Sequence, residues 1–103
     1  MSSDGAAQRD LATREGDPAR VTVRYWAAAR QAAGVEEDHV AARTVGEALA
    51  HVRAIHAHQP RFEAVLGVSS LLLGSSPVGL RDVDQLDVPP GEVVEVLPPF
   101  AGG

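Results

Sequence analysis

The chain has 103 residues and a formal net charge of −5 at pH 7, and it contains neither cysteine nor lysine. One small domain is expected at this length, and the missing residue types exclude disulfides, thiolate nucleophiles, cysteine-bound metal centres and lysine Schiff bases. An acidic chain without a basic run is a poor partner for nucleic acid, and its apolar stretches are far shorter than the roughly 18 residues of a membrane span.

The first 19 residues are predicted to form a flexible extension. They are polar, small and mixed in charge, and Leu11 is their only large apolar residue after Met1. A segment of this kind buries too little surface to offset the entropy lost on ordering. It also lacks the charged and then apolar pattern of a secretion signal, so we expect a cytoplasmic protein whose domain begins at residue 20.

A strand and then a short helix are predicted next. Residues 20–26 (RVTVRYW) alternate between two faces and are rich in the β-branched and aromatic side chains that favour strands. One face of this strand would carry Val21, Val23 and Tyr25, and the other Thr22, Arg24 and Trp26. Residues 27–33 (AAARQAA) are strong helix formers, and Gly34 stands where a helix C-cap belongs.

Residues 37–42 predict a second, weaker strand. The interval after the first strand is too short for a full crossover helix, so the two strands should pair antiparallel. Glu36, Glu37 and Asp38 are interpreted as a solvated run of carboxylates and not as a cation site.

The main helix is predicted from a capping box. Thr44 and Glu47 have the N-cap and N3 spacing of that motif, and the helix should end before Pro60. Its core-facing stripe would consist of Val45, Ala48, Leu49, Val52 and Ile55. The nearby His51, His56 and His58 lack the spacing of a chelating pair, so we interpret them as solvated and expect no metal site.

Further segments complete a predicted sheet. Residues 68–73 (VSSLLL) are apolar on both faces, which is typical of a central strand, and an edge strand is expected at 78–83 after a turn at 74–77. A turn at 89–92 (PPGE) leads into the last strand, residues 93–97 (VVEVL). The fold class is therefore α+β, with a sheet that one main helix covers on one face.

The last six residues, PPFAGG, form the most distinctive segment of the chain. Pro98 and Pro99 pre-set an extended backbone and cannot continue a hydrogen-bonded ladder, so the segment 98–103 should leave the sheet as a stiff arm. From Ala101 to Gly103 the side chains are a methyl group and then hydrogen atoms, which suits a narrow channel. The arm ends in an unhindered carboxylate.

Three segments in this order, VTVRYWAAARQAAGVEE, TVGEALAHV and PPGEVVEVLPPFAGG, resemble the small subunit of molybdopterin synthase. That subunit belongs to the MoaD-like branch of the MoaD/ThiS sulfur carriers, which are relatives of ubiquitin. The resemblance covers residues 20–103 and implies a β-grasp fold, a mixed sheet around one main helix. The turn at 74–77 lacks the asparagine that many relatives carry there, and the extension 1–19 is outside the family pattern.

The resemblance implies that Gly103 is the reactive residue. An activating enzyme similar to ubiquitin E1 would join its carboxylate to AMP from MgATP, and a sulfur donor would displace AMP. The resulting thiocarboxylate would enter the large subunit of molybdopterin synthase, so this chain itself would bind no cofactor and supply no catalytic side chain. Gly102, Ala101, Phe100, Pro99 and Pro98 would form the inserted tail, and Leu97 or Val96, whichever faces outward, would join a hydrophobic docking patch.

Other interpretations remain open from the residues alone. Phe100 could instead fold back on the core, as buried aromatic side chains commonly do. The carrier could serve thiamine, cysteine or another sulfurated product, because the Pro-Pro-Phe segment favours the molybdenum branch only by resemblance. Two further alternatives are a ubiquitin-like interaction module and a modifier that is joined through Gly103 to lysines of other proteins. The sequence identifies neither the activating enzyme, nor the sulfur donor, nor the stoichiometry of the complex.

Overall fold

The computed structural model describes residues 20–99. The predictions for the extension 1–19 and for the last four residues, 100–103, lie outside this range. The described elements, in chain order, are β1 (Arg20–Tyr25), α2 (Ala27–Ala33), β2 (Glu37–Ala41), α3 (Val45–Ile55), α4 (Pro60–Val68), β3 (Ser70–Leu73), β4 (Ser76–Pro77), the 3-10 helix η1 (Val83–Gln85) and β5 (Val93–Leu97).

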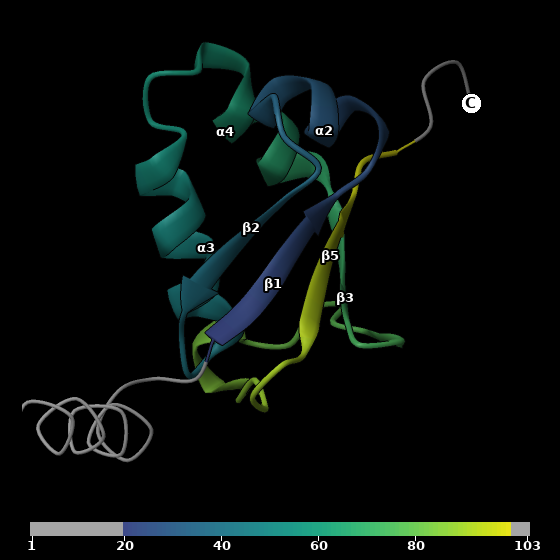
Figure 1. Ribbon diagram of the computed structural model, residues 1–103. Helices are drawn as coiled ribbons and strands as arrows, with labels where there is room; N and C mark the ends of the chain where they lie inside the picture. The colour runs from purple at the N-terminus through teal and green to yellow at the C-terminus, as the bar shows by residue number, and fades with distance from the viewer. Residues whose placement is uncertain (1–19, 100–103) are drawn as a thin grey trace, which may run out of the picture.

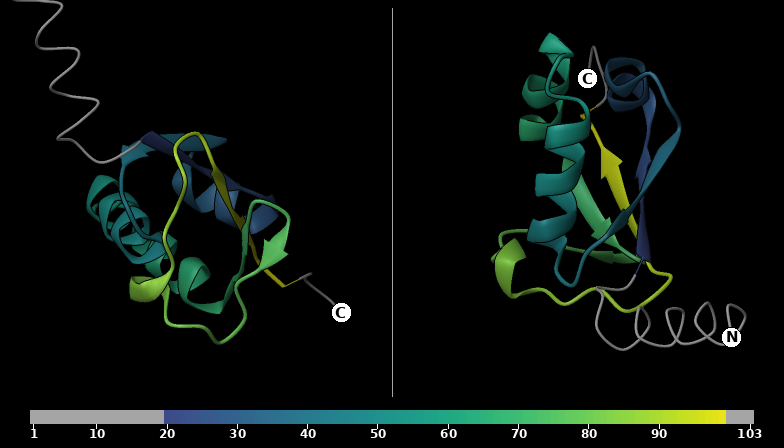
Figure 2. Two further views of the ribbon diagram at one scale, coloured as in Figure 1. Left: turned by 90° about the horizontal axis from the view of Figure 1, so that it is seen from below. Right: turned by 60° about the vertical axis from the view of Figure 1, so that its left-hand side comes forward.

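The strands form one mixed five-stranded sheet in the order β2-β1-β5-β3-β4. The last strand, β5, lies in the middle and runs parallel to β1, whereas the other neighbouring strands pair antiparallel. The longest helix, α3, lies along one face of the sheet together with α4 (Figures 1 and 2). This mixed sheet around a main helix is the β-grasp arrangement, so the predicted fold class is confirmed.

The first strand and helix form where the sequence predicts them. Val21, Val23 and Tyr25 are buried on the helix-facing side of β1, and each valine contributes about 1.5–3 kcal/mol by its burial. The α2 helix spans Ala27–Ala33 and ends at Gly34, whose φ of 79° is the left-handed conformation that favours glycine. The β2 strand then returns antiparallel to β1, as predicted.

The main helix begins with the predicted cap but buries a different last residue. The Thr44 hydroxyl oxygen accepts a 3.1 Å hydrogen bond from the Glu47 backbone N–H, and Glu47 in turn accepts one from the Arg43 backbone. Val45, Ala48, Leu49 and Val52 face the core as expected. The prediction for Ile55 is wrong because this side chain is 45% exposed, and the next inward position on the same helix face is His56.

The segment after Pro60 differs from the prediction. The sequence predicts Pro60 only as the end of a helix, yet it also occupies the first turn of α4. Backbone N–H groups in the first turn have no acceptor within the helix, so proline costs no hydrogen bond there. Phe62 and Leu66 anchor α4 to the core. Since α4 extends to Val68, β3 begins only at Ser70 and not at the predicted residue 68. It lies between β5 and β4, so its predicted place inside the sheet is confirmed.

The predicted edge strand at 78–83 is also wrong. The sheet ends at the two-residue β4, Ser76–Pro77, and the chain then turns at Gly79 with a φ of 61°. The Arg81 guanidinium donates to the carbonyl oxygens of Pro77 and Val78, which stabilises the turn. Among the described residues, no helix is long and apolar enough to cross a membrane.

Candidate functional site

The base of the C-terminal tail lies where the middle strand of the sheet ends. Val96 is buried in the core and Leu97, on the opposite face of β5, is half-buried. Leu97 is therefore the outward-facing residue of the two and the candidate for the proposed docking role, because the Val96 side chain is buried in the core. Pro98 and Pro99 follow outside any strand, and neither has an N–H group that could continue the ladder.

A shallow apolar groove lies beside the tail base. Its volume is about 480 Å³. Its walls are formed by Trp26, Ala27, Ser70, Leu97, Pro98 and Pro99. Most of these atoms are carbon, and Trp26 is 41% exposed. A groove with this lining can accept an apolar side chain from another protein.

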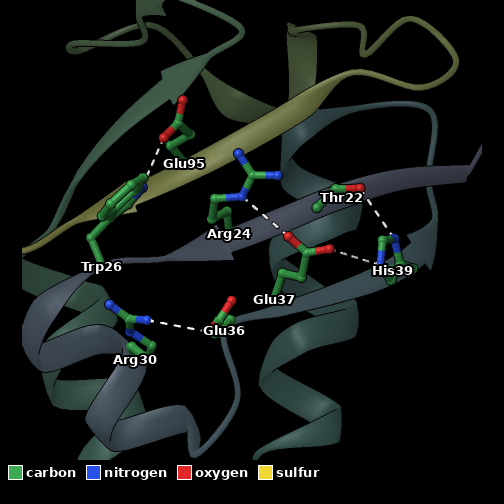
Figure 3. A network of polar contacts seen from close by, with 8 residues as sticks. All are labelled: Thr22, Arg24, Trp26, Arg30, Glu36, Glu37, His39 and Glu95. Atoms are coloured by element: carbon green, nitrogen blue, oxygen red, sulfur yellow. Dashed lines mark hydrogen bonds and ion pairs between the residues drawn. The ribbon is translucent and has the colours of Figure 1, made fainter.

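Trp26 is held in place by two hydrogen bonds to β5. Its backbone N–H donates to the Val96 carbonyl at 3.1 Å, and its indole Nε1–H donates to Glu95 Oε1 at 2.7 Å (Figure 3). The large ring is therefore fixed against the strand that leads into the tail. Because rigid aromatic side chains lose little entropy on binding, Trp26 is suited to serve as a docking anchor.

The open face of the sheet becomes more polar away from this groove. Arg24 pairs with Glu37 at 3.1 Å, Glu37 also lies 3.1 Å from His39, and Arg30 pairs with Glu36 at 3.5 Å (Figure 3). Glu36 and Glu37 were expected to be solvated, and they are exposed and half-buried, respectively, while they form pairs across β1, β2 and α2. The apolar groove therefore lies at one end of a sheet face that otherwise carries paired charges.

The prediction that His56 is solvated is wrong. His56 is only 5% exposed, and its Nε2 lies 2.6 Å from Asp38 Oδ2. Asp38, expected in a solvated acidic run, also accepts a 2.7 Å hydrogen bond from the Tyr25 hydroxyl. Burial, followed by the hydrogen bond to Asp38 and its charge, raises the pKa of Tyr25 well above its ordinary value. His51 and His58 are exposed, in agreement with the prediction.

The rest of the predicted site is only partly placed by the structure. Leu97, Pro98 and Pro99 meet at one groove, while Phe100, Ala101, Gly102 and Gly103 lie outside the described residues. Within the described range 20–99, no group of three or more histidine, aspartate or glutamate residues is placed to hold a metal ion. Trp26, which lines the groove, is not among the site residues predicted from the sequence. The signal that could have identified Trp26 was its position on the outward face of a strand, directly before a helix.

Comparison with solved structures gives the same fold. Small archaeal modifier protein 1 from Methanosarcina acetivorans is 22% identical, with a TM-score of 0.66 over 82% of this chain and 97% of that one. A molybdopterin converting factor subunit 1 from Pyrococcus furiosus, described as putative, is 23% identical, with a TM-score of 0.60 over 80% and 99%. Subunit 1 of the molybdopterin-converting factor of Helicobacter pylori, solved in complex with subunit 2, is 24% identical, with a TM-score of 0.57 over 82% and 99%.

No protein-family model and no curated protein matches the sequence. The structural likeness therefore concerns the fold, which is the ubiquitin-like β-grasp fold of the MoaD/ThiS sulfur carriers. The resemblance stated from the sequence is therefore confirmed at the level of the fold.

Proposed function

We propose that this chain is a sulfur carrier for molybdenum cofactor biosynthesis and that the carboxylate of Gly103 carries the sulfur. The observation that supports this most directly is the placement of the tail base. The middle strand β5 is paired on both sides and leads directly into Pro98 and Pro99 beside an apolar groove. A terminal Gly-Gly sequence after that base provides a slender acyl group.

The proposed chemistry takes place at the chain terminus. A free carboxylate is a poor acyl donor, so an E1-like enzyme would attach AMP from MgATP to Gly103 and release pyrophosphate. A sulfur donor would then displace AMP and leave a thiocarboxylate. MgATP would be bound by the activating enzyme, and the absence of cysteine from this chain fits a carrier whose sulfur is held on its backbone terminus.

The groove would serve as the docking surface for the large subunit of molybdopterin synthase. Trp26 and Leu97 would contact an apolar side chain of that subunit, while the tail 98–103 enters its active site. A complex of this kind is described for the neighbour from Helicobacter pylori, which was solved together with subunit 2 of its converting factor. The catalytic side chains would then belong to the large subunit.

Intact-mass measurement tests the proposal. The full chain is incubated with MgATP, an E1-like activating enzyme and a sulfur source, and the expected result is the mass increase of one oxygen-to-sulfur exchange. A variant without Gly103 is the matched control and should stay unmodified while remaining folded. The modified chain should then support molybdopterin formation with a large subunit. Rescue of a thiamine-carrier deletion, together with failure in the molybdopterin reaction, would favour a carrier for another product.

Conjugation to other proteins is the second candidate function. Two neighbours, from Methanosarcina acetivorans and Haloferax volcanii, are named as modifier proteins. The same activated Gly103 would then react with a lysine of a target protein. Because this chain has no lysine, it could not be extended by further copies on its own side chains. Attachment to larger polypeptides in the same incubation would support this function, and an interaction module would keep partner binding without Gly103.

A further inference from the structure

A buried polar cluster joins the strands and helices at one end of the molecule. It consists of Tyr25 from β1, Asp38 from β2, His56 at the end of α3 and Gln59 before α4. Tyr25 and His56 are almost fully buried, and the His56 ring packs against the rings of Tyr25 and Phe62 at centroid distances of 5.8 and 4.6 Å. Buried polar atoms require matched donors and acceptors, so the hydrogen bonds constrain where the protons lie.

The contact with Asp38 places a proton on one ring nitrogen of His56. Asp38 Oδ2 accepts the Tyr25 hydroxyl at 2.7 Å and lies 2.6 Å from His56 Nε2. An ionised carboxylate can only accept hydrogen bonds. Therefore Nε2 carries a hydrogen that it donates to Asp38.

The contact with Gln59 places a second proton on the other ring nitrogen. Gln59 Nε2 donates a 2.8 Å hydrogen bond to the carbonyl oxygen of Ala33, the last residue of α2. This bond fixes the orientation of the amide, since the reverse orientation would direct one carbonyl oxygen at another. Gln59 Oε1 consequently faces His56 Nδ1, with which it forms a hydrogen bond. An amide oxygen only accepts, so Nδ1 must also be a donor.

We infer that His56 is the doubly protonated imidazolium, that it forms a buried ion pair with Asp38, and that the pair links the sheet to three helices. A neutral ring would leave one nitrogen lone pair against an acceptor oxygen. The desolvation of two charges is offset here by their contact and by the hydrogen bonds from Tyr25 and to Gln59. The link joins β1, β2, α2, α3 and α4.

Tyr25 and Asp38 are the titratable groups that face His56, and Gln59, Phe62 and the Ala33 carbonyl are the uncharged ones. Since the pKa of Tyr25 is raised, its hydroxyl stays neutral and donates to Asp38.

Nitrogen-15 NMR of the full chain tests the proton count directly. At neutral pH, His56 should give two ring N–H signals with one-bond nitrogen–proton coupling, one for each nitrogen. The exposed His39, His51 and His58 should show none that survive exchange with water. Both ring N–H signals should disappear in the His56→Gln variant, which assigns them to His56. One ring N–H signal for His56, on either nitrogen, would overturn the inference, including the case in which Asp38 holds the proton instead.

Urea unfolding at neutral pH tests the link. His56→Gln should unfold at a lower urea concentration than the wild-type chain. The variant His51→Gln is the matched control, because this exposed histidine lies on the same helix, and it should unfold as the wild-type chain does. Equal midpoints for His56→Gln and the wild-type chain would contradict the proposal, and the NMR measurement decides if His56→Gln does not fold.

Discussion

At the scale of single residues, the groove at the tail base depends on Trp26. The indole is 41% exposed, yet its Nε1–H is bonded to Glu95 and its backbone to Val96. Such a ring adds little to the core but presents a fixed apolar surface beside Leu97. This exposed and fixed position is what supports its role as an anchor in the proposed function.

We predict that Trp26→Ala weakens binding to the large subunit of molybdopterin synthase by roughly 2 kcal/mol or more, which is the range of an aromatic anchor. Titration calorimetry measures this change. Val35→Ala is the matched control, because Val35 is equally exposed at 42% but does not line the groove, and it should bind as the wild type does. Equal affinities for the two variants would remove Trp26 from the interface.

Asp38 is a second residue whose role is specific. Its carboxylate is the shared acceptor of the Tyr25 hydroxyl and the His56 ring. Removing one partner of a buried charged pair leaves the other without compensation and typically costs about 3–5 kcal/mol. We predict a loss of this size for Asp38→Ala by urea unfolding. The neighbouring Glu36→Ala should change stability by less than about 1 kcal/mol, since Glu36 is 78% exposed and its pair with Arg30 is a surface one. Similar losses for both variants would contradict this difference.

At the scale of helices and strands, periodicity and cap residues predicted the first half of the chain well. Alternation in 20–25, alanine content in 27–33 and the Thr44–Glu47 spacing are local signals, and the structure places elements at each. The second half was harder because its signals are ambiguous. Pro60 fits both the end of one helix and the start of the next, so α4 was missed.

Tertiary packing explains the other differences. Ile55 and His56 both continue the α3 stripe by helical spacing, three and four residues after Val52. The buried position goes to His56 because Asp38 and Gln59 supply partners for its polar atoms, and these lie far away in the sequence or beyond the helix. Likewise, the groove brings Trp26 beside Leu97 only through the parallel pairing of β1 with β5. No local pattern contains these contacts.

The N-cap of α3 gives a prediction at this scale. Thr44→Ala removes the hydroxyl that accepts from the Glu47 N–H, and loss of such a cap costs typically about 1 kcal/mol. We expect that decrease in the free energy of unfolding. Thr44→Ser keeps the hydroxyl and should recover most of the loss. A Thr44→Ser variant as unstable as Thr44→Ala would assign the effect to the lost methyl group instead.

At the scale of the whole molecule, the core is complete within the described residues. Its buried cluster runs from Val21 to Val96 and draws on the strands β1, β2 and β5 and on the described helices α2, α3 and α4. The two strands that pair in parallel at the centre, β1 and β5, lie near the two ends of this range. The fold therefore requires the segment 20–97 as a unit, and the tail base is attached to its last strand.

The location of the core within residues 20–97 leads to a prediction about the first 19 residues. Their composition offers almost no apolar surface for the core, so a chain that starts at residue 20 after a methionine should unfold at the same urea concentration as the full chain. It should also accept sulfur on Gly103 at the same rate in the intact-mass experiment, because the groove and β5 are retained. A matched deletion at the other end, which removes Val96 and all that follows, should not fold, since Val96 is fully buried. If the N-terminal deletion lowered only the sulfur transfer, residues 1–19 would contribute to the encounter with the activating enzyme and not to the fold.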